Sequence, residues 1–264
     1  MPSGILAVDF RRTLKAKDHM NAIRSIAKKI PGLRRVYRSY INFADRQRLK
    51  GKAPDEVFTE IYNENRWGNN ESISGPGSAL DQTRAVRDRL PILLDELGAK
   101  TILDIPCGDF NWLKNLKLDD IQYTGADIVD EIVSNNKKNF QKENISFQNL
   151  NLLSDELPEV DLIFCRDCLV HFSFDDIWCA LQNICRSGSK YLLTTTFTEH
   201  FKNYDIMTGQ WRRINLQLKP FSLPKPIKII SEECTEANGE YADKSLGLWL
   251  VDDILATLNK ISEA

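Results

Sequence analysis

Short apolar runs alternate with amphipathic segments along the central part of the chain, between residues 101 and 197. Such alternation is typical of a parallel sheet with helices on both faces. The pattern predicts an α/β, Rossmann-like, doubly wound fold, with a mostly parallel seven-stranded sheet and an antiparallel closing strand. Strands are predicted at 101–105, 122–127, 145–150, 160–166, 190–197, 227–233 and 245–251, and helices near 80–97, 110–117, 129–141 and 174–186.

The N-terminal part follows a different pattern. Apolar residues recur at helical spacing from Met20 to Ile30 and again from Leu33 to Ala44, which predicts two amphipathic helices. We therefore expect a helical arm over residues 1–52, ahead of a domain at 53–264. The arm carries 14 Lys+Arg against 3 Asp+Glu, a net charge of +11, so the remainder carries −13. An anionic membrane or a nucleic acid would suit its basic face, but the simpler interpretation is a solvated face on an arm that packs on the domain or on a second subunit.

Composition places the chain among ordinary globular proteins. Its 264 residues fit one α/β domain with an appendage, and 42% hydrophobic residues argue against disorder. The six cysteines are scattered through strand-like and helix-like segments, and no signal peptide or transmembrane run is visible, which predicts a reducing, cytoplasmic location. Cys165 and Cys168 lack a second pair at zinc spacing, so no metal is expected.

The first strand of the central pattern ends in a tight acidic turn. Pro106 and Gly108 are expected to make the turn, with Asp104 and Asp109 on either side. Ligands of such sheets bind at this edge. The G-x-G-x-x-G spacing of dinucleotide sites is absent, and two carboxylates would repel a pyrophosphate. They suit the sulfonium and the α-amino group of S-adenosylmethionine.

The second strand ends in Asp127, nineteen residues after Gly108, the spacing at which a carboxylate can accept both ribose hydroxyls. With these two motifs, roughly residues 100–200 resemble the class I S-adenosylmethionine-dependent methyltransferases. The resemblance implies methyl transfer as the activity and S-adenosylmethionine as the cofactor. It also implies a cofactor-binding set of Trp67, Gly75, Asp104, Pro106, Gly108, Asp109, Asp127, Ile128, Asn151, Leu152 and Arg166.

Within that superfamily, the segments 61–68, 71–78 and 165–172 are similar to a bacterial branch with members in surface-glycan or phosphoramidate pathways. The chain departs from the superfamily pattern twice. Pro106-Cys107 stands where glycines are usual, and Asn149-Leu-Asn151 lacks the aspartate often used against the adenine amino group. An asparagine carbonyl can still accept that hydrogen bond.

A Gly-, Asn- and Ser-rich stretch at 63–80 is too long and polar for a plain connector and predicts a functional loop. The backbone amides of Gly75–Ser78, supplemented by Arg66, could hold a carboxylate of the cofactor or of an acidic substrate. The alternative is a turn followed by a helix N-cap.

Two polar residues after the fourth strand are candidates for catalysis. His171 is expected beside the methyl site, and with a reference pKa of about 6.5 it could act as general base. Alternatively, His171 has a structural role and caps the helix expected to begin near Ser173. Asp167 could orient the histidine or the cofactor, or form a salt bridge with Arg166. His200 is a reserve base, or a histidine of a surface loop.

The long segment 198–226 lies where class I methyltransferases insert substrate lids. Arg212 and Arg213 could clamp a phosphate or carboxylate, and Trp211 and Phe221 could stack on a sugar or a planar ring. Alternatively, the aromatic residues fill a core beneath the lid and the arginines are solvated.

Together these features predict a methyltransferase that modifies oxygen on a small polar acceptor such as a sugar, a sugar nucleotide or a phosphoramidate-like compound, anionic if the arginines clamp it. A catalytically silent, cofactor-binding scaffold that docks through its basic arm on a membrane or a partner is one alternative. A nucleic-acid methyltransferase is another. Against it, the catalytic part is acidic, and Cys165–His171 stands where a base-flipping Asn/Asp-Pro-Pro-aromatic motif would be.

Overall fold

A computed structural model describes residues 43–262. The chain divides into two compact units, residues 1–50 and 51–264. Of the first unit, only the stretch from residue 43 is described, and it is helical over 43–49. The two amphipathic helices of the arm otherwise lie outside the described residues, so the helical arm at 1–52 stays a prediction.

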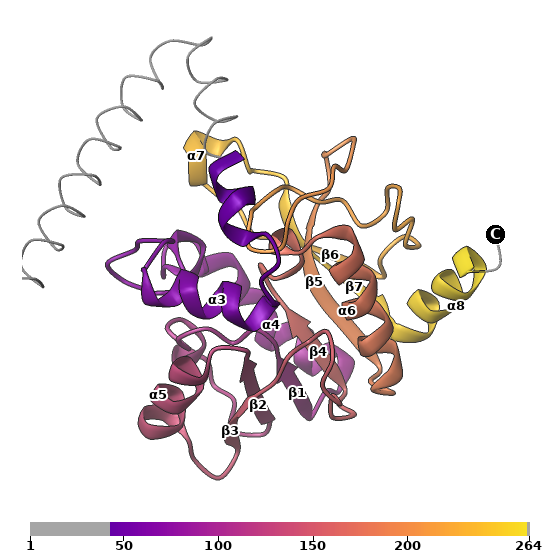
Figure 1. Ribbon diagram of the computed structural model, residues 1–264. Helices are drawn as coiled ribbons and strands as arrows, with labels where there is room; N and C mark the ends of the chain where they lie inside the picture. The colour runs from indigo at the N-terminus through magenta and orange to yellow at the C-terminus, as the bar shows by residue number, and fades with distance from the viewer. Residues whose placement is uncertain (1–42, 263–264) are drawn as a thin grey trace, which may run out of the picture. The chain divides into compact units, whose positions relative to one another are not determined.

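The second unit is built on a seven-stranded sheet with the strand order β3-β2-β1-β4-β5-β7-β6 (Figure 1). Strands β1 to β5 pair in parallel, whereas β7 runs antiparallel between β5 and β6. The predicted fold class is confirmed. The strands are β1 (Thr101–Asp104), β2 (Gln122–Asp127), β3 (Ile145–Asn149), β4 (Leu162–Cys165), β5 (Tyr191–Phe197), β6 (Lys228–Ser231) and β7 (Lys244–Leu250).

Helices cover both faces of the sheet, because consecutive strand residues point to opposite sides. Leu103 of β1 packs in one buried cluster with Ile177 of α6 and Ile254 of α8. Its neighbour Ile102 packs in the other cluster, with Leu90 of α4 and Val133 of α5. The two clusters form the core. The helices are α3 (Pro54–Asn63), α4 (Arg84–Leu97), α5 (Asp130–Phe140), α6 (Phe174–Arg186), α7 (Glu236–Gly239) and α8 (Val251–Ser262).

Some local predictions differ from the structure. The helix expected near 110–117 is only a 3-10 turn, Leu113–Asn115. Phe110, just before it, has a left-handed backbone with φ 56° and is buried, so this segment folds around packing rather than around a helical face. Helices α3 and α8 were not predicted. Helix α8 follows β7 directly, without the turn residues that normally announce a new element.

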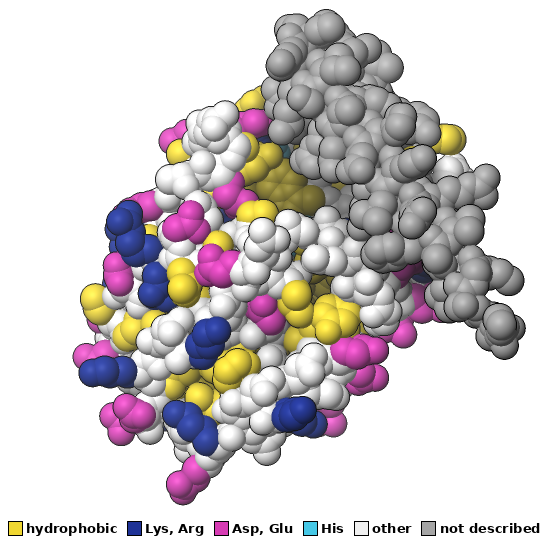
Figure 2. Space-filling view, turned by 90° about the vertical axis from the view of Figure 1, so that its left-hand side faces the viewer, with side chains coloured by type: hydrophobic (Ala, Val, Ile, Leu, Met, Phe, Trp, Pro, Cys, Tyr) yellow, Lys and Arg dark blue, Asp and Glu magenta, His cyan; other side chains and the backbone are white. Residues whose placement is uncertain are grey.

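The described surface carries both signs of charge. On the face drawn in Figure 2, Lys and Arg side chains are interspersed with Asp and Glu over the described residues. None of the helices within residues 43–262 has the length and apolar character needed to cross a membrane.

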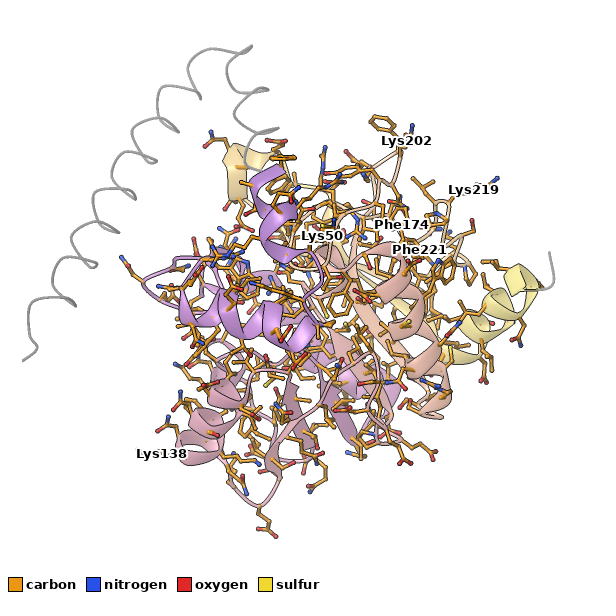
Figure 3. All side chains as sticks on the ribbon, in the orientation of Figure 1. Lys50, Lys138, Phe174, Lys202, Lys219 and Phe221 are labelled. Atoms are coloured by element: carbon orange, nitrogen blue, oxygen red, sulfur yellow. The ribbon has the colours of Figure 1, made fainter. Side chains whose placement is uncertain are left out.

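The segment 198–226 contains no regular helix or strand. It packs against α6 through Phe221, whose ring centroid lies 5.2 Å from that of Phe174 and 5.0 Å from that of Trp178. Figure 3 shows Phe174 and Phe221 together, with Lys202 and Lys219 farther out on the loops. The segment is therefore anchored to the domain by aromatic packing.

Candidate functional site

A cavity opens at the carboxyl ends of β1, β2 and β4, the edge at which the sequence placed the ligand. Helix α3 and the loop after it form the opposite wall. Most of the predicted cofactor and catalytic residues line this cavity: Trp67, Asp104, Pro106, Gly108, Asp109, Asp127, Ile128, Asn151, Leu152, Arg166, Asp167 and His171. Gly75 does not. It packs against Trp67, because a Cβ on Gly75 would lie 3.2 Å from the Cβ of Trp67.

Asp104 ends β1 in a buried position, with 2% of its surface exposed. The Tyr123 hydroxyl donates a 2.5 Å hydrogen bond to Asp104 Oδ2. Burial raises the pKa of the Asp104 carboxyl to about 8, and the nearby Asp127 raises it further, while the bond from Tyr123 opposes both. The carboxyl is therefore largely protonated at neutral pH, and a cation placed beside it would favour its ionised form.

Asp127 ends β2 and binds two backbone amides. Gly108 N donates to Asp127 Oδ2 at 3.1 Å, and Val129 N donates to Oδ1 at 3.0 Å. Burial raises its pKa to about 6, and the amide bonds limit the rise. Because each carboxylate oxygen has a second lone pair, Asp127 can still accept a pair of hydroxyl donors.

Asp109 lies on the cavity wall, but its carboxylate holds the loop after α3. Ser72 Oγ donates to Asp109 Oδ1 at 2.9 Å, and Ile73 N donates to Oδ2 at 3.0 Å. The loop approaches so closely that a Cβ on Gly108 would lie 2.2 Å from Ser74 Oγ, and Gly108 also has a φ of 54°. Glycine is thus required on both counts. The structure thus shows Asp109 anchoring the loop, and its contact with the cofactor stays a prediction.

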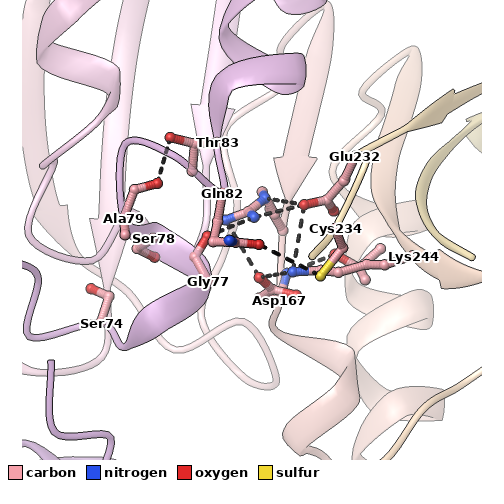
Figure 4. Close-up of polar contacts among 12 residues, drawn as sticks. Ser74, Gly77, Ser78, Ala79, Gln82, Thr83, Asp167, Glu232, Cys234 and Lys244 are labelled. Atoms are coloured by element: carbon pink, nitrogen blue, oxygen red, sulfur yellow. Dashed lines mark hydrogen bonds and ion pairs between the residues drawn. The ribbon is translucent and has the colours of Figure 1, made fainter. Parts of the chain in front are cut away.

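Arg166 and Asp167 follow β4 and belong to a charge cluster with Glu232 and Lys244, in which only Asp167 is partly exposed (Figure 4). Arg166 Nη2 donates to Glu232 Oε2 at 2.6 Å and to the Gly77 carbonyl at 2.8 Å. Lys244 Nζ donates to Asp167 Oδ2 at 2.6 Å. Burial alone would raise the pKa of Asp167, but Lys244 and Arg166 lower it to about 2. Asp167 is thus a paired anion and a weak base.

His171 ends a 3-10 turn, Leu169–His171, and lines the cavity beside Trp67, with ring centroids 5.1 Å apart. Its Nδ1 donates to the Gln210 carbonyl at 3.0 Å. This bond leaves the lone pair on Nε2, which makes no side-chain hydrogen bond among the described residues 43–262. Burial lowers the pKa of His171 to about 4, so the ring is neutral at neutral pH.

The segment 207–212 holds the turn that carries His171. Gly209 N donates to the His171 carbonyl at 2.8 Å, and Arg212 N donates to the Val170 carbonyl at 3.0 Å. Ser173 N in turn donates to Thr208 Oγ1 at 2.9 Å. The orientation of His171 is therefore fixed by a part of the chain about forty residues away.

The structure contradicts the prediction that Arg212 clamps a phosphate or carboxylate of the acceptor. Its side chain is 0% exposed and donates to three carbonyls, those of Leu169, Phe172 and Tyr204, at 2.9, 2.9 and 3.1 Å. A guanidinium engaged in this way cannot clamp an acceptor anion. Arg212 is instead a tie between the 198–226 segment and the His171 turn.

The other predicted acceptor residues also lie away from the cavity wall. Phe221 is 0% exposed and forms part of the core, as the alternative interpretation held. Trp211 packs on Tyr241 with centroids 4.9 Å apart. Arg213 approaches the Glu240 carbonyl at 3.5 Å.

Arg66 pairs with two glutamates of its own segment, Glu60 at 3.3 Å and Glu64 at 3.0 Å, and does not line the cavity. His200 is also absent from the wall. It is 9% exposed, and neither ring nitrogen has a partner among the described residues. A surface position for His200, the alternative interpretation, is therefore not what the structure shows.

Sequence reasoning missed the wall made by α3. Phe58 and Tyr62 lie one helical turn apart, face the same way and line the cavity. The signal was the apolar spacing at Val57, Phe58 and Ile61, which indicates an amphipathic helix. Trp112 lines the cavity as well and carried no motif of its own, while Ser74 lines it from the loop predicted to be functional.

Residues 102–189 match a family model described as a methyltransferase domain. Among solved structures, human N-acetylserotonin methyltransferase in complex with S-adenosylmethionine is 19% identical, with a TM-score of 0.54, over 81% of this chain and 67% of that one. Haemonchus contortus phosphoethanolamine N-methyltransferase 1, in complex with phosphoethanolamine and S-adenosylhomocysteine, is 13% identical, with a TM-score of 0.54, over 80% and 54%. These likenesses show the fold. A comparison with curated proteins gave no match.

The family match covers β1 to α6, the part of the chain that supplies Asp104, Asp127 and His171. The sheet around it has the strand arrangement expected of the class I enzymes. Residues 102–189 thus match a methyltransferase domain, and the sheet that contains them has the Rossmann-like fold of the two methyltransferase structures.

Proposed function

We propose that this protein methylates a hydroxyl of a small acceptor and that His171 is the general base. The observation that carries the proposal is the neutral His171 ring on the cavity wall, with Nδ1–H committed to the Gln210 carbonyl and Nε2 making no side-chain hydrogen bond among the described residues. A base needs such a lone pair within reach of the proton that it removes.

The residues around the cavity fit the cofactor. Asp127 has lone pairs for a ribose diol, and Asp104 offers a buried carboxyl that a positive charge would ionise. Gly108 keeps the turn between them narrow. When bound, S-adenosylmethionine supplies a methyl group on a positively charged sulfur.

The chain's own contribution to the reaction is positioning and proton removal. The acceptor oxygen would bond to the methyl carbon that the cofactor supplies, the electron pair of the carbon–sulfur bond would remain on a neutral thioether, and His171 Nε2 would accept the hydroxyl proton. The paired anion Asp167 favours the imidazolium that forms, against the cost of burial.

Among the acceptors predicted from the sequence, a sugar hydroxyl fits the cavity better than the anionic classes. The arginines that would have held a phosphate, Arg66, Arg212 and Arg213, do not line it. Membrane or subunit contacts of the basic arm stay a prediction, as does the cytoplasmic location.

The test is methyl transfer itself. Full-length protein is incubated with methyl-labelled S-adenosylmethionine and a panel of hydroxylated sugars and phenols, and labelled product is counted. We expect product with wild type, and a loss of about 100-fold or more in His171→Gln, the range for removing a general base. Cofactor binding without transfer to any acceptor would favour the silent scaffold instead.

A further inference from the structure

Four rings, one of which is that of the proposed base, line the acceptor end of the cavity. They are Phe58 from α3, Trp67 from the following loop, and His171 and Phe172 from the turn after β4. Centroids lie 6.4 Å apart for Phe58 and Trp67, 5.9 Å for Phe58 and Phe172, and 5.1 Å for Trp67 and His171. We call these four residues the aromatic cup.

The charged side chains beside the cup already pair with each other. Asp167 accepts from Lys244 at 2.6 Å, and Arg166 donates to Glu232 at 2.6 Å. Among the described residues that line the cavity, no other lysine or arginine occurs. A charged acceptor group in the cup would therefore be buried without a free counter-ion, which is costly.

The remaining carboxyl groups of the wall lie at the other end of the cavity. Asp104, Asp109 and Asp127 follow β1 and β2, where the cofactor is placed. With a cation bound beside them, the ionised Asp104 and Asp127 add a negative potential that opposes an anionic acceptor. Charge is thus concentrated in the cofactor half, while the cup is apolar.

We infer that the acceptor places an uncharged ring with a flat apolar face in the aromatic cup and that the methylated hydroxyl is carried by this ring. The inference rests on the proposed function, because the cup is the acceptor subsite only if His171 is the base. A phenolic ring and a sugar ring share this chemistry, since both present an apolar face to an aromatic side chain and a hydroxyl at the edge.

Ligand-observed NMR on the full-length protein saturated with S-adenosylhomocysteine tests the inference. The probes are phenol and methyl β-glucoside, which are neutral, and phenyl phosphate and benzylammonium, which carry opposite charges. We expect the neutral probes to bind and each charged probe to bind at least about tenfold more weakly than phenol, because its charge would be unpaired. The neutral probe that binds more tightly shows whether the acceptor ring is phenolic or a sugar.

Variants connect the binding to the cup. Trp67→Ala is expected to weaken the neutral probes about tenfold, and Trp67→Phe to keep most of the affinity, because stacking needs a ring rather than an indole. Phe58→Leu, which keeps the bulk of the side chain, serves if Trp67→Ala misfolds. The control is Phe201→Ala, since Phe201 is 87% exposed and does not line the cavity.

Three outcomes overturn the inference: a charged probe that binds as tightly as phenol, an unchanged affinity in both Trp67→Ala and Phe58→Leu, or no binding of either neutral probe. Calorimetry with S-adenosylhomocysteine on the same samples separates the two proposals. If this thioether does not bind, the proposed function fails. If S-adenosylhomocysteine binds while one of these three outcomes occurs, the proposed function stands and only the assignment of the cup as the acceptor subsite fails.

Discussion

The cofactor half and the acceptor half of the cavity are built in different ways. In the cofactor half, Asp104, Gly108 and Asp127 come from two adjacent strands and the turn between them, within 24 residues of sequence. In the acceptor half, Phe58, His171 and the carbonyl of Gln210 come from segments far apart in the chain. The first half is a local motif, whereas the second exists only after the chain has folded.

The difference also appears in the electrostatics. Burial raises the pKa of Asp104 to about 8 and of Asp127 to about 6, so the cofactor half is prepared for a positive ligand. In the acceptor half, burial lowers the pKa of His171 to about 4, and the neighbouring charges are paired. One half thus provides charge recognition and the other provides a neutral base in an apolar setting.

The largest expected effect separates catalysis from cofactor binding. His171→Gln should lower kcat by about 100- to 10,000-fold, the usual contribution of a general base. The affinity for S-adenosylhomocysteine should change less than about twofold, since no charge is removed from the cofactor half. Steady-state kinetics and a binding titration on the same sample measure both quantities. Equal losses in kcat and in the affinity for S-adenosylhomocysteine would mean that catalysis and cofactor binding do not depend on separate halves of the cavity.

Asp127→Ala should have the reverse effect. It removes a carboxylate expected to accept two ribose hydroxyls, and each such bond contributes about 1.5–3 kcal/mol, so the affinity for S-adenosylmethionine should fall about 100-fold or more. Equilibrium dialysis with labelled cofactor gives the value. Asp127→Asn keeps the shape and is the matched control, with an intermediate loss expected. An Ala variant that binds as tightly as wild type would remove Asp127 from the site.

Arg212→Ala tests whether the 198–226 segment supports the acceptor half. The change leaves three buried carbonyls without their donor, so the free energy of unfolding should fall by about 3 kcal/mol. Urea denaturation measures the loss. Arg213→Ala, at the neighbouring and partly exposed position, should stay within about 0.5 kcal/mol of wild type. Equal stability of the two variants would contradict the structural role given to Arg212.

The smallest expected effect is a pH dependence in the cofactor half. Because the pKa of Asp104 is raised from 3.8 to about 8, its contribution to the stability of the cofactor-free protein is complete below pH 3.8 and is lost as pH rises toward 8. A bound cation favours the ionised carboxyl, so binding releases a proton and tightens with pH by at most about tenfold per unit. Calorimetry in buffers of different ionisation heat counts the proton. Asp104→Asn should abolish the dependence, and a wild type without proton release would contradict it.

The cofactor half was largely accessible to sequence analysis, for a physical reason. An apolar strand, a turn glycine and an acid at fixed spacing are all features of neighbouring residues, and they remain together whatever the rest of the chain does. The ends of β1 and β2 therefore lie where the pattern placed them. The contacts of these residues with the cofactor stay a prediction.

The acceptor half was less accessible. Nothing in the residues around Arg212 indicates that its donors will meet the carbonyls of Leu169 and Phe172, because those partners lie about forty positions away. Arginine usually lies on the surface, so the pattern favoured a ligand clamp over a buried tie. For Phe221 the sequence left a stacking role and a core position open, because its burial depends on Phe174 and Trp178 of another element.

The most direct test of the account is a calorimetric titration of the full-length protein with S-adenosylhomocysteine and, separately, with NAD. We expect one thioether molecule to bind per chain in wild type, with little binding in Asp127→Ala, and no measurable heat with NAD. Tight binding of NAD without binding of the thioether would contradict the central claim that this acidic sheet edge is built for a sulfonium donor.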